Sequence, residues 1–116
     1  NYSTSYNKVT KSLEIKIQPS NGTLLVLGNS LSGLPILESL EVYSVEPLDV
    51  KGSFTNLTNL KEINFTSTFP KNLYSEIVKL KNLKTLKLKK PYDDEEKELV
   101  DKLRKLPNLN LVLPIY

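Results

Sequence analysis

Apolar residues recur every 23 positions along most of this 116-residue chain, and this periodicity constrains the fold more than any other feature of the sequence. Five columns of four positions are apolar without exception, although only 39% of the residues are hydrophobic. The columns are Leu31, Phe54, Ile77, Val100; Leu34, Leu57, Leu80, Leu103; Leu37, Leu60, Leu83, Leu106; Leu40, Ile63, Leu86, Leu109; and Val42, Phe65, Leu88, Leu111. The sequence therefore predicts one structural unit stacked four times, because a single copy cannot bury both of its faces.

Each copy has two parts with different spacing. The last two apolar residues alternate with polar ones, as in Leu86-Lys87-Leu88, which indicates a strand with one buried face. The residues before them, for example Ile77 and Leu80, are three apart, which favours a helical or 3₁₀ turn packed on the sheet.

The unit reads apolar-x-x-Leu-x-x-Leu-x-x-apolar-x-apolar and resembles the repeat of leucine-rich repeat proteins over residues 31–113. The resemblance implies an α/β solenoid with a parallel concave sheet and short helices or 3₁₀ turns on the convex side. One departure is that Val45, Thr68 and Pro91 stand where the family usually has asparagine, which predicts irregular turns after the strands.

Residues 1–116 are expected to form a single domain, with four repeats and a C-terminal cap over 31–116. Residues 1–30 do not keep the register and are interpreted as an N-terminal hairpin cap or a degenerate repeat. In the hairpin, a strand around Ile15 is followed by the turn signal Asn21-Gly22 and by the second apolar run Leu24–Leu27. Residues 1–10 are expected to be loose or a residual strand.

The clearest predicted helix spans Asp93 to Leu106. Asp93 is suited to the N-cap with Glu96 three residues later, and Pro107 ends the segment. The acidic run 93–96 is interpreted as helix capping rather than as a cation site, since the ligand pattern of a calcium loop is missing.

The composition excludes several kinds of chemistry. The chain has no His and no Cys, which excludes imidazole bases, thiol nucleophiles and nearly all zinc sites, and we expect no cofactor, no metal and no enzymatic activity. The longest apolar run, Leu24–Leu27, is far too short for a membrane span.

A net charge of +3 does not indicate nucleic acid binding. A lysine cluster is interpreted as solubilising surface rather than as a polyanion footprint; its members are Lys79, Lys81, Lys84, Lys87, Lys89 and Lys90.

In the predicted architecture, polar residues between the buried positions face outward from the concave sheet and form the candidate binding surface. Strand by strand, they are Ser39, Glu41, Tyr43; Glu62, Asn64, Thr66; Thr85, Lys87, Lys89; and, at the last strand, Asn108, Asn110 and Val112. The mixed charge of this surface suits a protein partner more than a polyanion, and Tyr43 is its one aromatic anchor.

Four sites fit the acceptor pattern for N-linked glycans, at Asn1, Asn21, Asn56 and Asn64. They favour an extracellular or cell-surface protein, with a cytoplasmic location as the alternative. A glycan on Asn64 would obstruct the predicted binding surface.

The leading functional hypothesis is a non-enzymatic module that binds a protein or glycan ligand on its concave sheet. Two alternatives stay open: a structural subunit of a surface assembly that associates through the solenoid ends, and an intracellular adaptor or effector segment.

Overall fold

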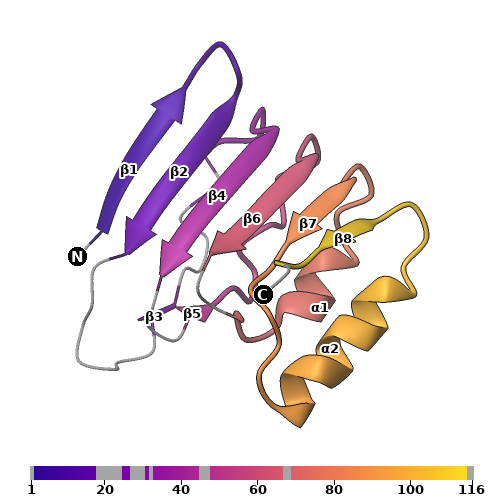
Figure 1. Ribbon diagram of the computed structural model, residues 1–116. Helices are drawn as coiled ribbons and strands as arrows, with labels where there is room; N and C mark the ends of the chain where they lie inside the picture. Colours follow the sequence, from indigo (N-terminus) through magenta and orange to yellow (C-terminus); the bar gives the residue numbers. More distant parts are fainter. Residues whose placement is uncertain are drawn as a thin grey trace.

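Strands with one buried face form a six-stranded sheet, which the computed structural model describes together with two helices (Figure 1). The structure describes residues 2–17, 25–26, 31, 33–44, 48–66 and 69–114. In spatial order the strands of the sheet are β1 (Tyr2–Asn7), β2 (Ser12–Ile17), β4 (Ser39–Ser44), β6 (Glu62–Thr66), β7 (Thr85–Lys87) and β8 (Asn110–Val112). The remaining elements are the parallel pair β3 (Leu25–Val26) and β5 (Leu48–Asp49), and the helices α1 (Leu73–Ile77) and α2 (Asp94–Arg104).

The sheet is mixed, because β1 runs antiparallel to β2 whereas the other neighbours are parallel. The turn between β1 and β2 is stabilised by Asn7, whose Oδ1 accepts hydrogen bonds from the backbone N–H groups of Val9 (2.9 Å) and Thr10 (3.1 Å). Lys11 closes this turn in the left-handed conformation, with φ of 55°. The turn thus joins β1 to β2 as a hairpin, and β1 lies at one edge of the sheet.

The pairing register places residues 23 apart opposite one another across three strands. Leu40 lies opposite Ile63, and Ile63 lies opposite Leu86. The last strand differs, because Leu86 lies opposite Leu111 and not opposite Leu109 as the 23-residue columns predict. The connection from β7 to β8 contains all of α2, and the chain uses two more residues to return to the sheet.

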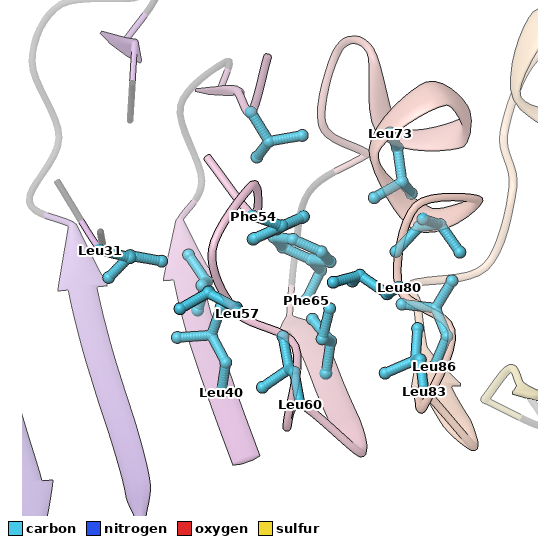
Figure 2. Close-up of a cluster of buried hydrophobic side chains, with 14 of the residues drawn as sticks. Leu31, Leu40, Phe54, Leu57, Leu60, Phe65, Leu73, Leu80, Leu83 and Leu86 are labelled. Atoms are coloured by element: carbon cyan, nitrogen blue, oxygen red, sulfur yellow. The ribbon is translucent and has the colours of Figure 1, made fainter. Parts of the chain in front are cut away.

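The core lies between the sheet and the turns and helices on one side of it (Figure 2). All of the twenty apolar column positions are buried except Leu34, Leu106, Leu109 and Leu111, which are partly buried and pack against the core. At its centre the rings of Phe54 and Phe65 lie 6.4 Å apart between centroids, tilted by 47°. The apolar pattern therefore identifies the core correctly.

The predicted α/β solenoid of the leucine-rich repeat type is wrong as a description of this fold. The structure is a small domain with a mixed, mostly parallel sheet and two helices, and it is not an open solenoid. Its radius of gyration is 13.4 Å, which is the value expected for a compact domain of this length. The antiparallel β1–β2 hairpin widens the sheet at one edge, and α2 packs against both α1 and β8 at the other.

Most leucines spaced three apart form single turns instead of helices. Backbone N–H groups of Leu57 and Leu60 bond to the carbonyls three residues earlier, at 3.1 and 3.2 Å, and Leu80 and Leu83 repeat the pattern at 3.0 and 3.2 Å. Bonds between residues three apart are those of a 3₁₀ turn, and in the described chain helices occur in only two connecting segments.

The predicted N-terminal hairpin is also wrong in its pairing. Residues 2–7, expected to be loose or a residual strand, form the partner of β2, whereas Leu25–Val26 of the second apolar run pairs in parallel with β5. The turn signal Asn21-Gly22 lies outside the described residues.

The predicted C-terminal helix is confirmed as α2. Asp93 is its N-cap, with the side-chain oxygen accepting from the backbone N–H of Glu96 at 2.8 Å. The Glu96 carboxylate in turn accepts from the backbone N–H of Tyr92 at 2.8 Å, so the acidic run caps the helix. With 11 residues, α2 is the longest helix of the described chain, where none has the length and apolarity needed to cross a membrane.

Candidate functional site

One face of the six-stranded sheet is left uncovered by α1 and α2, which both lie on its other side (Figure 1). We call this surface the polar sheet face, because the alternating residues that form it are almost all polar. The strand register assigns to it Ser3, Ser5, Asn7, Ser12, Glu14, Lys16, Ser39, Glu41, Tyr43, Glu62, Asn64, Thr85, Lys87, Asn110 and Val112.

Register aligns these residues into rows that run across the strands. The central row contains Ser5, Glu14, Glu41, Asn64 and Lys87, from β1 to β7 in order. Successive members of a row are direct cross-strand neighbours, so their side chains are within contact distance. The row therefore runs from a hydroxyl through two carboxyl groups and an amide to an amine.

The two carboxyl groups of this row form a hydrogen-bonded pair. Glu14 and Glu41 are opposite each other on adjacent parallel strands, and their carboxyl groups share a hydrogen bond. Asn64 Nδ2 donates to Glu41 Oε2 at 3.1 Å, and Lys16 Nζ lies 3.7 Å from Glu14 Oε1. When one of two neighbouring carboxyl groups is protonated, it can donate to the other, and the charge repulsion between them is relieved.

The pair changes the acidity of Glu41. The hydrogen bond with Glu14 raises the pKa of Glu41 above its ordinary value of 4.5, and burial and the charge of Glu14 raise it further. The hydrogen bond from Asn64 and the positive charge of Lys87 act in the opposite direction. The net effect is a pKa of Glu41 above its ordinary value.

A shallow depression of about 430 Å³ lies over this row. Its lining is hydroxyl, carboxyl, amide and amine groups, apart from Leu13 and Leu40. The polar residues that line it are Ser5, Asn7, Ser12, Glu14, Ser39, Glu41, Glu62, Asn64 and Lys87. The depression thus offers many hydrogen-bond donors and acceptors and little apolar surface.

The structure brings together most of the predicted binding residues. Ser39, Glu41, Tyr43, Glu62, Asn64, Thr85 and Lys87 lie on the polar sheet face, and the register places Thr66 beside Tyr43. On β8, the predicted residues Asn110 and Val112 lie opposite Thr85 and Lys87.

Two predicted positions are not part of this face. Lys89 follows the end of β7, with Nζ 3.6 Å from Glu96 Oε1 and 5.5 Å from the centre of the Phe69 ring. Asn108 precedes β8 in a left-handed turn, with φ of 66°. Another member of the predicted lysine cluster, Lys79, also has a carboxylate partner, with Nζ 3.1 Å from Glu76 Oε2.

Sequence reasoning missed the contribution of β1 and β2. Glu14 and its neighbours Ser5, Asn7 and Ser12 fall outside the 23-residue register, so they were not aligned with Glu41. The available signal was the alternation around Ile15, which places Glu14 on the face opposite the core.

The glycan acceptor sites differ in accessibility. Asn56 is exposed in a turn, whereas Asn64 is half-buried and uses its Nδ2 atom, to which a glycan would attach, to donate to Glu41. A glycan on Asn64 would disturb that contact and occupy the polar sheet face. Asn1 and Asn21 lie outside the described residues.

The carboxyl pair predicts a pH-dependent stability that Glu41→Gln removes. Because the folded state raises the pKa of Glu41, the pair stabilises the fold fully below pH 4.5, and this stabilisation is lost as the pH rises through the folded pKa. A glutamine keeps an oxygen for Asn64 and an N–H for Glu14, so we expect E41Q to be more stable than the wild type at pH 7 by about 0.2 to 1 kcal/mol. Urea unfolding between pH 4 and pH 8 measures the difference.

The matched control is Glu62→Gln, which makes the same charge change on the same face. Glu62 lies opposite Ser39 and Thr85, so no carboxyl group is its direct cross-strand neighbour. A pH profile that changes equally in both variants would contradict the pairing of Glu14 with Glu41.

No three His, Cys, Asp or Glu side chains are grouped to hold a metal ion anywhere in the described part of the chain. Comparisons with protein-family models, curated proteins and solved structures find no match for this chain. The resemblance to leucine-rich repeat proteins therefore stays a prediction from the sequence.

Proposed function

We propose that this domain is a non-enzymatic binding module that takes up a glycan on its polar sheet face. The observation that carries the proposal is the depression of about 430 Å³, with its lining of carboxyl, hydroxyl, amide and amine groups. Sugar hydroxyl groups donate and accept hydrogen bonds at once, and the mixed lining supplies partners for both roles.

The sheet supports this role physically. The lining side chains come from β1, β2, β4, β6 and β7, whose spacing is fixed by backbone hydrogen bonds. The residues between them are buried in the core, or, like Tyr6 of β1, pack against it. Little conformational entropy is lost when side chains on such a rigid surface bind a ligand.

A protein ligand is the second candidate, and two exposed hydrophobic residues favour it. Tyr43 and Val112 lie on the polar sheet face and are 43% and 37% exposed. Aromatic anchors dominate many protein interfaces, so Tyr43→Ala is the change that distinguishes the two candidates.

The test is a binding screen on a printed panel of glycans with wild-type protein and the variant Lys87→Ala. We expect K87A to weaken binding about tenfold, the effect of losing one charge-assisted hydrogen bond. Lys81→Ala is the matched control, because Lys81 is exposed in a turn and does not line the depression.

Absence of binding across the panel, or equal losses in K87A and K81A, would contradict glycan recognition at this face. A ligand whose affinity falls with Y43A but not with K87A would favour the protein candidate.

We propose further that the protein acts at the cell surface or outside the cell, supported by the exposed acceptor site at Asn56. Intact mass of the protein from its native source, before and after glycan removal, tests this. An unmodified Asn56 in that material would favour the cytoplasmic alternative.

A further inference from the structure

β1 is an open edge of the six-stranded sheet. It pairs with β2 on one side, and no strand of the described chain lies along its other side (Figure 1). An edge strand presents backbone N–H and C=O groups that can pair with another strand. The opposite edge, β8, has only three residues and offers a much shorter edge.

β1 lacks the features that usually prevent an edge strand from pairing with another chain. Its six residues, Tyr2–Asn7, include no charged residue and no proline. They pair one to one with β2, so no bulge twists the edge away. Ser3, Thr4 and Ser5 are exposed. The edge is therefore long, regular and uncharged, which suits strand addition.

The sequence of β1 points to a second copy of the same chain as the added strand. Residues 2–6 read Tyr-Ser-Thr-Ser-Tyr, which is the same in both directions about Thr4. Antiparallel pairing about a two-fold axis at Thr4 places Thr4 opposite Thr4 of the second copy, and Ser3 opposite Ser5 of the second copy. Such like pairs of hydroxyl residues are favourable cross-strand neighbours, and a closed two-fold contact uses the same surface on both chains.

We propose that β1 is a homodimer interface, in which two chains pair their β1 strands antiparallel about Thr4 and join their two sheets into one. The arrangement places the polar sheet faces of both copies on a continuous surface. Since Ser5 and Asn7 of β1 line the depression, the two depressions lie on either side of the dimer axis. The dimer does not depend on what the depression binds.

The experiment is a charge-swap series at Thr4, followed by sedimentation velocity over a range of protein concentrations. The wild type is expected to shift from 13.2 kDa towards twice that mass as the concentration rises. Thr4→Lys and Thr4→Glu each place like charges opposite each other, so either variant alone is expected to stay monomeric. An equimolar mixture of the two places opposite charges together and is expected to restore the dimer.

Val9→Lys is the matched control, because Val9 is 90% exposed in the turn after β1 and is similar in shape to threonine. We expect V9K to dimerise like the wild type. Restoration in the mixture also shows that both Thr4 variants are folded.

Three results would overturn the proposal: a wild type that stays monomeric at every concentration, dimers that persist in T4K or T4E alone, or a mixture that stays monomeric. The first result leaves the edge free for a strand of another protein. The second would place self-association elsewhere on the molecule. None of these results changes the outcome of the glycan screen, so the dimer proposal and the glycan proposal can be rejected independently of each other.

Discussion

Leu86→Lys should unfold the domain. Leu86 is 0% exposed in the middle of β7, opposite Ile63 and Leu111, and its side chain lies in the core. A lysine there would have to bury an ammonium group without a partner, which costs far more than the usual 0.5 to 3 kcal/mol of a single substitution. We expect a loss of more than about 4 kcal/mol, close to the whole stability of a small domain.

Thr85→Lys is the control for this prediction. Thr85 is the neighbour of Leu86 on the same strand, but it lies on the polar sheet face. The same new charge there should change the free energy of unfolding by less than about 0.5 kcal/mol. Urea unfolding followed by circular dichroism measures both variants, and a folded L86K with an unchanged midpoint would contradict the assignment of the two faces of β7.

Phe65→Ala should cause the second largest loss, about 3 to 5 kcal/mol. Phe65 is 1% exposed and contacts the ring of Phe54, which is equally buried, across the space between sheet and turns (Figure 2). The truncation removes the transfer free energy of the ring and leaves a cavity lined by side chains from several strands. The backbone hydrogen bonds of the sheet hold these strands in place, so the cavity cannot close.

Phe65→Leu is the graded control, because it keeps most of the volume, and it should cost only about 1 to 2 kcal/mol. Thermal and urea unfolding give both values. Equal losses in the two variants would mean that the site collapses around any smaller side chain, and that Phe65 does not fill the centre of the core.

The core was predictable because burial follows the apolar columns directly. Leu57, Ile63 and Leu86 are buried as expected, since a strand or turn with this spacing can exclude water on only one face. The helix around Val100 was predictable for a similar reason, because its cap, its acidic first turn and its final proline all favour the same boundaries.

The shape of the domain was not predictable in the same way. β1 has the polar residue Thr4 opposite the buried Ile15, where an alternating strand would have an apolar residue, so the hydrophobic periodicity gave no indication that it pairs with β2. The hydrogen bonds of Asn7 stabilise the turn that joins the two strands. The sequence predicted the candidate-site residues on β4, β6 and β7. It did not predict Glu14, the carboxyl partner of Glu41, because the pairing of β1 with β2 was not part of the prediction.

The even spacing of the parallel strands has a consequence for how the chain folds. Ser39 pairs with Glu62 and Glu62 with Thr85, each 23 residues further along, while Ser12 pairs with Ser39 and Thr85 with Asn110 across 27 and 25 residues. Closing a loop of this size costs about 3 kcal/mol of chain entropy, nearly the same for every parallel strand. No parallel strand pairs with a distant part of the chain, so the sheet can form from any neighbouring pair and extend towards both edges. Parallel sheets ordinarily fold slowly because their strands are far apart in sequence, and here that separation is small at every step.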